Sequence, residues 1–396
     1  MSGCFCFPRG KRATTQQGVT LIELMVAILI GLVLVLAITT LLIKGESEKR
    51  VTTSVNDREQ SGAYATLLLD RALRSAGSGL AQTSVVGGYG CALTAQKSGA
   101  AILPRATTWP DPFASFPLAP RLAPVLIQKG AAVDDSDTLM VMTGAAADGD
   151  VPRPIRGGSG NQVQLDGTLQ IIGGDIVLLT NDGSDCLIEQ VQNGFLGSDT
   201  QPALNFAGAY FTTGSPTAPL SNLLVSGAYL SELGNVNDGA TPPQFMLYGI
   251  NSQYQLTSYD MLQTGPAGAT TVDSAQPIAD GVEKLYALYG VDTDGDGKVD
   301  NWVTPEGVWS IDQLSIDPTR LKQVLAVRLA LLLRGALAEK DAVPQQVVAA
   351  DGTIKIFADA PAVTHTLTLS TDEQRYRYQL IDTVVPLRNA LLVSAP

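Results

Sequence analysis

The chain has 396 residues and a formal net charge of −12 at pH 7. That length accommodates a membrane segment with one large domain or two small ones. Only 16% of the residues are charged and 6% are aromatic, a composition typical of an exported β-rich domain rather than of an average soluble protein. The acidic balance argues against binding to nucleic acid through a broad basic surface, so we expect no nucleic-acid partner.

The first residues of the chain are basic, with Arg9, Lys11 and Arg12 and no acid before Gly18. An ordinary secretory signal carries its apolar run before the cleavage site, but here the apolar run begins only at Val19. By the positive-inside rule the basic residues stay in the cytoplasm. This places the remainder of the chain, beyond the apolar run, on the other side of the membrane.

Residues 19–43 form an almost wholly apolar run in which Glu23 is the one formal charge. A helix of this length spans roughly 38 Å, enough to cross a hydrocarbon core of about 30 Å with some tilt. We therefore predict a transmembrane helix. Glu23 does not fit a simple anchor, because a carboxylate facing lipid costs at least about 2.5 kcal/mol and usually has a partner.

The residues from Gly18 to Met25 are Gly-Val-Thr-Leu-Ile-Glu-Leu-Met, followed by the apolar run. This segment resembles the processing site of type IV prepilins and type II secretion pseudopilins. The resemblance implies that prepilin peptidase cuts between Gly18 and Val19 and that the new amine of Val19 is methylated. It also implies that Glu23 pairs with the N-terminal amine of a neighbouring subunit in the filament. One departure is Val19, because the first mature residue of the family is usually Phe.

The same resemblance implies other minor and major pilins as partners, reached through the N-terminal helix in the inner membrane. It places the protein there as a single-pass subunit with a periplasmic head, and at the pilus or cell surface after assembly. We predict a leader at 1–18, a transmembrane and assembly helix at 19–43, its amphipathic continuation at 44–77 and a β-rich head at 78–396.

Helical spacing continues from Val51 to Arg74 at intervals near 3.6 residues, and Gly77 and Gly79 end it. One long helix is the first interpretation. The alternative is a membrane anchor and a separate amphipathic helix joined at Gly45.

Beyond residue 78, short apolar runs alternate with Gly, Pro, Ser and Thr, which is typical of strands and turns. Residues 104–124 are proline-rich and predicted to be an extended loop, as are residues 198–219. Residues 324–333 fit a buried helix or a strand, and we predict a strand. The predicted fold class is α+β, with a long N-terminal helix and a head of antiparallel sheet. The predicted strands are Thr138–Thr143, Gln162–Ile172, Asp175–Thr180, Leu187–Gln192, Leu223–Leu230, Gln244–Tyr254, Val282–Val291, Gln323–Leu333, Ile354–Phe357, Thr364–Leu369 and Arg375–Leu387.

Several segments of the head resemble PilW-type minor pilins, in the order that the family has them. They are Ser61–Ala65, Leu69–Gly77, Tyr89–Cys91, Asp185-Cys186, Ala279–Glu283, Tyr289–Asp292, Val327–Leu329 and Val384–Asn389. The resemblance implies a non-enzymatic minor pilin of a type IV pilus, acting at the pilus tip or in assembly initiation. Two alternatives stay open: a minor pseudopilin of a type II secretion system, and a tip adhesin whose head binds a ligand.

Cys91 and Cys186 both lie in the part predicted to be exported. An oxidising periplasm favours a disulfide between them, and the alternative is two separate thiols. Closing a loop of nearly 100 residues would stabilise the fold by at most about 4.7 kcal/mol in the chain-entropy model.

The acidic segment 292–300 has carboxylates at alternate positions. Asp292, Asp294 and Asp296 are expected to offer side-chain oxygens to one Ca²⁺, with the carbonyl of Lys298 and with Asp300 acting directly or through water. The position that carries a bidentate Glu in an EF-hand is Val303 here, so we predict a structural calcium site and not a sensor. The alternative is a solvated acidic turn without a metal.

A catalytic site is not expected. His365 is the one histidine and alternates with Val363 and Leu367 in a predicted strand, where a structural role is far commoner than a general base. The glycine-rich segment 157–160 lacks the Lys of a phosphate-binding loop. Trp302 and Trp309 are predicted to belong to the core.

Overall fold

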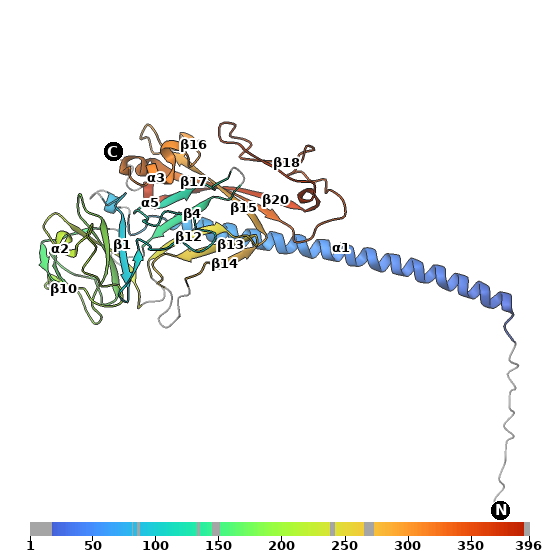
Figure 1. The fold of residues 1–396 in the computed structure, drawn as a ribbon, viewed down its shortest axis with the longest axis horizontal. Helices are drawn as coiled ribbons and strands as arrows, with labels where there is room; N and C mark the ends of the chain where they lie inside the picture. Colours follow the sequence, from blue (N-terminus) through green and yellow to red (C-terminus); the bar gives the residue numbers. More distant parts are fainter. Residues whose placement is uncertain are drawn as a thin grey trace, which may run out of the picture. The chain divides into compact units, whose positions relative to one another are not determined.

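The computed structural model describes residues 18–80, 82–84, 88–132, 135–144, 151–237, 242–264 and 273–391 (Figure 1). The predicted leader lies outside these residues, except for Gly18. Two compact units, residues 1–55 and 56–396, divide the chain within its first helix.

The helices are α1 (Leu21–Ser75), η1 (Gln82–Ser84), α2 (Leu220–Leu223), η2 (Gly307–Trp309), α3 (Ile311–Leu314), α4 (Pro318–Gln323), η3 (Glu373–Arg375) and α5 (Arg388–Leu391). The strands are β1 (Leu93–Lys97), β2 (Ala100–Leu103), β3 (Val125–Gln128), β4 (Thr138–Thr143), β5 (Arg153–Pro154), β6 (Gly157–Ser159), β7 (Gln162–Gln164), β8 (Asp175–Thr180), β9 (Cys186–Gln190), β10 (Ala203–Asn205), β11 (Tyr229–Asn235), β12 (Gln244–Ile250), β13 (Gln255–Asp260), β14 (Gln276–Asp280), β15 (Val282–Val291), β16 (Asn301–Val303), β17 (Val324–Arg334), β18 (Thr353–Ile356), β19 (His365–Thr368) and β20 (Tyr378–Pro386).

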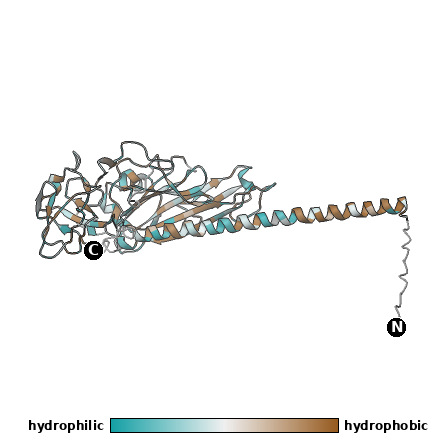
Figure 2. Ribbon diagram, turned by 90° about the horizontal axis from the view of Figure 1, so that it is seen from below, coloured by the Kyte–Doolittle hydropathy of each residue, from teal (hydrophilic) through white to brown (hydrophobic). Residues whose placement is uncertain are grey.

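Helix α1 is one helix of 55 residues and passes through Gly45 without a break. The colouring in Figure 2 shows that its first half is continuously hydrophobic and that its second half alternates. In the second unit, Ala65, Leu69 and Leu73 are fully buried. Their spacing of four residues puts them on one face of the helix, which explains why this half packs on the head.

The second half of α1 packs closely on the head at Gly62, and a cap then ends the helix after Ser75. A Cβ added at Gly62 would overlap the side chain of Leu333 on β17, so glycine allows the helix and the sheet to approach there. Past the last turn, Gly77 has a φ of +77°, a conformation that glycine adopts without strain. The Asn389 side-chain amide donates to the carbonyl oxygens of Ser75, at 3.3 Å, and Ala76, at 3.0 Å. The C-terminal segment therefore supplies the cap of the N-terminal helix.

The described residues of the head form three larger sheets, ordered β2-β1-β9-β8-β11-β5, β14-β13-β12-β4-β3 and β16-β15-β17-β20, and two small ones, β10-β7-β6 and β18-β19. The pairings are antiparallel except that β1 and β9 run parallel. This arrangement, after one long apolar helix, confirms the α+β prediction. In Figure 1, α2 and β10 lie at one end of the head and β18 lies toward the other.

Strand β17 is buried on both faces. Leu329 and Leu331 belong to the main core, which also contains the buried face of α1. Ala330 and Leu332 belong to a second layer formed with the β18–β19 hairpin. A strand covered on both faces favours apolar residues at nearly every position, so the apolar run here, broken only by Arg328, is a strand and not a helix, as predicted.

Two strand predictions are wrong. The run 162–172 has only the short β7, and Thr168 continues the chain as a loop by donating its hydroxyl to the carbonyl of Gln201 at 2.8 Å. The run 223–230 contains the end of α2, and β11 begins only at Tyr229. In both runs the apolar side chains fill a separate core of the head instead of one face of a strand.

Candidate functional sites

The first turn of α1 contains Glu23, the carboxylate of the N-terminal motif. Thr20 precedes the helix and its carbonyl accepts from the backbone of Leu24 at 3.1 Å, while its hydroxyl accepts from the backbone of Glu23 at 3.3 Å. A hydroxyl that accepts from the third residue on is a typical N-cap. Gly18 and Val19 precede this turn and both are exposed. The predicted cut site therefore lies directly before a capped helix.

The apolar side chains of α1 from Leu21 to Ile43 lie in the open. Leu21 is 77% exposed and Leu41 is 70% exposed. This helix has an 18-residue window of mean hydropathy 3.1 that is not buried in the protein, and by length and composition it can cross a membrane. An apolar surface of this size in water marks an interaction site or a membrane segment.

Cys91 and Cys186 are joined by a disulfide, with their Cα atoms 5.6 Å apart. The bond links the segment before β1 to the first residue of β9, where Cys186 is the register partner of Leu93 in the parallel pair. Cys186 is almost completely buried. The disulfide therefore links two segments of one sheet that are 95 residues apart in the sequence.

The acidic loop connects β15 to β16 and is built from local hydrogen bonds. The two carboxylate oxygens of Asp292 accept from the backbone of Gly295 at 2.6 Å and of Gly297 at 2.8 Å. Both glycines have φ near +80°, which keeps the turn tight without strain. Asp300 accepts from the backbone and the hydroxyl of Thr293, each at 2.7 Å, and this lowers its pKa.

Three of the predicted calcium ligands converge. Carboxylate oxygens of Asp292, Asp294 and Asp300 all lie within 4.8 Å of one another. Asp296 is not part of this group, because its carboxylate is paired with the ammonium of Lys298 at 2.6 Å, and that contact lowers the pKa of Asp296. Three hard oxygen donors around one point suit Ca²⁺, but fewer of them converge than the alternation of acids predicts.

Glu189 and Arg328 are among the buried charged side chains of the head that the sequence analysis did not single out. Glu189 on β9 is completely buried, and burial raises its pKa to about 9. Arg328 on β17 pairs with Asp382 at 2.7 Å and Asp359 at 2.6 Å, and its guanidinium lies over the ring of Phe357. For Arg328, the signal available in the sequence was a single charge inside the otherwise apolar run 324–333.

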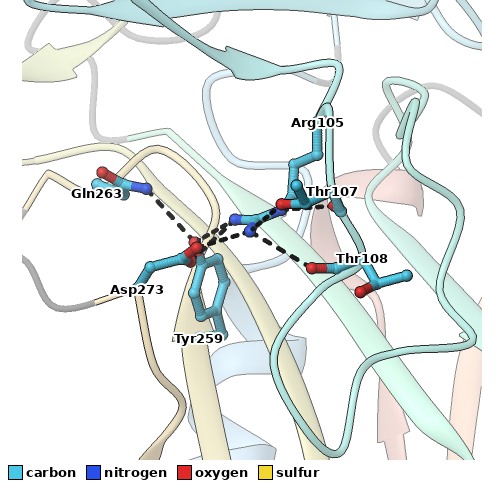
Figure 3. Close-up of polar contacts among 6 residues, drawn as sticks. All are labelled: Arg105, Thr107, Thr108, Tyr259, Gln263 and Asp273. Carbon is cyan, nitrogen blue, oxygen red and sulfur yellow. Dashed lines mark hydrogen bonds and ion pairs between the residues drawn. The ribbon is translucent and has the colours of Figure 1, made fainter.

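A polar cluster ties the proline-rich loop to β13 (Figure 3). The guanidinium of Arg105 donates to Asp273 at 2.7 Å and to the hydroxyl of Tyr259 at 2.8 Å, and it lies over the ring of Trp109. The Tyr259 hydroxyl in turn donates to Asp273 at 2.7 Å. The hydrogen bond from Arg105 lowers the pKa of Asp273. Each polar group of the cluster has a partner, so we interpret it as a structural tie.

The predicted histidine and tryptophan positions also have structural surroundings. His365 on β19 packs against the ring of Tyr286, with centroids 4.5 Å apart. Trp302 is partly buried against the layer under the β18–β19 hairpin, and Trp309 against the main core.

Two family models match the chain. Residues 14–39 match the prokaryotic N-terminal methylation motif, and residues 248–389 match the family described as Type IV Pilus-assembly protein W, PilW. The PilW model covers 142 of the 396 residues, so it identifies a PilW-type domain in this part of the chain. No curated protein and no solved structure matches it.

Together, the PilW match and the methylation motif support a minor pilin of a type IV pilus. The PilW match runs from β12 to Asn389 and so includes the sheet with β15 and β17, the acidic loop and the residue that caps α1. The methylation motif includes Gly18, Val19 and Glu23. The part of the head between these two matches, with the disulfide, belongs to neither.

Proposed function

We propose that prepilin peptidase cuts this PilW-family subunit between Gly18 and Val19, and that the new amine of Val19 is methylated. The mature subunit then stays in the inner membrane through the apolar half of α1, with its head in the periplasm. It joins other minor and major pilins through α1 and acts at the pilus tip or in the complex that initiates assembly. The role is structural and non-enzymatic.

The observation that carries this proposal is the combination of an exposed apolar helix with one carboxylate in its first turn. The apolar side chains need lipid or neighbouring helices as cover. The carboxylate of Glu23 is the one group in that run that distinguishes a correctly placed neighbour from a misplaced one. A minor pseudopilin of a type II secretion system would carry the same helix, and deletion of the gene separates the two, since loss of pili supports our proposal and loss of protein secretion alone contradicts it.

Substitution of Gly18 is expected to block processing. Gly18→Val places a branched side chain at the cut site, so the precursor should remain uncut, whereas Gly18→Ala should be cut slowly. Mass spectrometry of the intact N-terminus measures the cut fraction. The matched control is Gly31→Val within α1, where an added Cβ meets nothing within 4 Å. Detection of Val19 as the first residue in Gly18→Val protein would exclude prepilin peptidase as the processing enzyme.

We also propose that the acidic loop holds a structural Ca²⁺, with Asp292, Asp294 and Asp300 supplying carboxylate oxygens and the carbonyl of Lys298 a further one. The support is the convergence of three carboxylates, which would repel one another without a cation. The ion would fix the turn between β15 and β16 and neutralise part of the acidic surface.

Calcium is expected to stabilise the full-length protein in detergent. With a dissociation constant of about 10⁻⁴–10⁻³ M, a concentration of about 10 mM would add about 1.4–2.7 kcal/mol to the free energy of unfolding. Asp294→Asn should abolish the resulting rise in melting temperature, and Asp296→Asn should reduce it less, because Asp296 lies outside the converging group. Asp182→Asn, in an exposed turn, is the control. An unchanged melting temperature of the unmutated protein in calcium and in a chelator would exclude the site.

A further inference from the structure

Strand β20 is an edge strand of the sheet ordered β16-β15-β17-β20. It has nine residues and pairs with β17 along its whole length without a register shift. In the described sheets, every other edge strand has five residues or fewer. Proteins commonly protect an edge by shortening it or by inserting proline, as in β14, which contains Pro277. In β20 a proline, Pro386, stands only at the last position.

The hydrogen bonds at the two ends of the β17–β20 ladder show which way the peptide groups of β20 point. The carbonyl of Arg377 accepts one of these bonds and the N–H of Leu387 donates the other, each at 2.8 Å. Because bonded and non-bonded residues alternate in an antiparallel pair, the odd-numbered residues of β20 bond to β17. The N–H and C=O groups of Leu380, Asp382 and Val384 therefore point outward, and we call this stretch the open edge.

A glutamine side chain occupies the positions just before the open edge. The Nε2 of Gln345 donates to the carbonyl of Tyr376 at 2.9 Å, and its Oε1 accepts from the backbone N–H of Tyr378 at 2.7 Å. It thus fills one acceptor and one donor of the strand, as a residue of an added strand would. Along the open edge itself, none of the described residues bonds to the outward peptide groups. Every residue from Gln379 to Val384 is at least partly exposed, so solvent reaches this edge.

The charge beside the open edge is acidic. Asp382 and Asp359 share the guanidinium of Arg328, at 2.7 and 2.6 Å, so this cluster keeps one negative charge in excess. The side chain of Asp359 is 70% exposed and can contact an incoming cation. Leu380 and Val384 lie on the same face of β20 as Asp382, and Val384 is 47% exposed. The strand that fits has a basic residue opposite Asp382 and an apolar residue two positions away on each side.

A second copy of this chain fits the open edge less well. Pairing of two β20 strands about a two-fold axis would place both Asp382 side chains, each with its Asp359, on one face of the joined sheet. Like charges across a strand pair are destabilising. The net charge of −12 on each chain adds to the repulsion. The charge pattern therefore favours a segment of a different polypeptide.

We propose that the open edge of β20 accepts an extended segment of another polypeptide as an added strand, with a basic side chain of that segment beside Asp382 and Asp359. The outward peptide groups supply the main-chain hydrogen bonds, and Leu380 and Val384 supply the apolar contacts. The open edge is about 14 Å long, which matches a strand of about five residues. This interaction does not depend on cleavage at Gly18 or on the position of the subunit in a filament.

The probe is the peptide acetyl-Val-Thr-Lys-Thr-Val-amide, titrated to about 5 mM against the full-length protein in detergent and followed by microscale thermophoresis. Its lysine lies opposite Asp382 when its valines lie opposite Leu380 and Val384. It should bind with a dissociation constant of about 1 mM or tighter. Glutamate in place of the lysine should weaken binding by about tenfold or more, because the new carboxylate faces Asp382 and Asp359.

Methylation of single peptide nitrogens separates strand addition from side-chain contact. In the added strand the lysine N–H points toward β20, so its methylation should abolish binding. The N–H of the first threonine points away from β20, so its methylation should change the dissociation constant by no more than about twofold.

Val384→Pro removes an outward N–H that the ladder with β17 does not use, so the head should fold and the lysine peptide should not bind. Val384→Thr is the matched control, because it keeps the N–H and the β-branched shape, and it should bind like the unmutated protein. The melting temperature checks the fold of both variants. If Val384→Pro fails to fold, the methylated peptides decide the question on the unmutated protein.

The proposal is overturned if the lysine peptide does not bind at about 5 mM, or if methylation of its lysine N–H has no effect. It is also overturned if folded Val384→Pro binds as tightly as Val384→Thr, or if the glutamate peptide binds as tightly as the lysine peptide. Analytical ultracentrifugation tests the remaining occupant. A dimer of the unmutated protein that Val384→Pro dissociates would show that a second copy occupies the edge, and would overturn the proposal.

Discussion

Replacement of Glu23 by alanine is expected to leave membrane insertion and cleavage at Gly18 intact but to prevent incorporation of the subunit into the filament or its initiating complex. The apolar run that drives insertion is unchanged by the substitution, and the cut site precedes the helix that contains Glu23. What is lost is the one carboxylate of the membrane segment. Its partner in our proposal is the Val19 amine of a neighbouring subunit.

The physical reason is a penalty for the wrong register. Glu23 lies four residues after Val19, about one helical turn from the new N-terminus. In a staggered bundle, the neighbour's amine can approach Glu23 while Ile22 and Leu24 exclude water. A low dielectric strengthens that pairing and makes an unpaired carboxylate costly, so a subunit docked at the wrong height is rejected. Glu23 would therefore set axial register more than anchor strength.

The measurement is co-purification of the variant with sheared pili and, after detergent extraction, with partner pilins. Recovery should fall by about tenfold or more, which corresponds to the loss of about 1.4 kcal/mol or more at each contact. Glu46→Ala is the matched control, since Glu46 is an exposed acid of the same helix beyond the apolar run. Recovery of Glu23→Ala at the level of the unmutated protein would show that the carboxylate does not determine assembly.

Replacement of Glu189 by glutamine is expected to stabilise the head at alkaline pH. Glu189 is completely buried on β9, and both of its oxygens have only the backbone N–H of Thr212 within reach among the described residues, at 3.2 and 3.3 Å. Burial raises its pKa from the ordinary 4.5 to about 9, and the hydrogen bond from Thr212 opposes this only in part. At neutral pH the folded head therefore holds a proton that the unfolded chain releases.

The sign of the pH dependence follows from this difference. Because the folded-state pKa is raised, stability falls as the pH rises through the window from about 4.5 to about 9. One pKa unit corresponds to about 1.4 kcal/mol, so the loss across that window is on the order of several kcal/mol. Glu189→Gln keeps the shape of the side chain without the charge, and it should remove most of this loss.

The melting temperatures of Glu189→Gln and of the unmutated protein are measured between pH 5 and pH 9 at constant calcium. Thermal unfolding is followed by tryptophan fluorescence. The two should have similar melting temperatures at pH 5, and the variant should be the more stable at pH 9. Glu306→Gln is the control, because it removes one carboxylate, as Glu189→Gln does, but from an exposed position. Parallel stability curves for Glu189→Gln and the unmutated protein would refute the role of this buried acid.

The membrane segment and its processing motif are readable from the sequence because their physics is local. The run from Val19 to Ile43 is apolar except for Glu23 and a few small or hydroxyl residues, so lipid can cover the helix that begins at Leu21, whatever the head does. Strands β4, β8 and β15 begin and end as predicted, since an apolar run between polar and glycine residues limits each of them. Strands of two or three residues, such as β5 and β10, carry no periodic signal and were not predicted.

Tertiary structure decided what depends on partners distant in sequence. The apolar run in β17 is a strand because separate layers cover its two faces. Asn389 caps a helix that ends more than 300 residues earlier, and the bulge at Glu283 is visible only in the pairing of β15 with β17. In the acidic loop the sequence offers alternate acids, but the fold converges three of them and turns Asp296 to Lys298. A carboxylate's role depends on the donors and cations that folding brings within hydrogen-bonding distance, and those neighbours are set by packing.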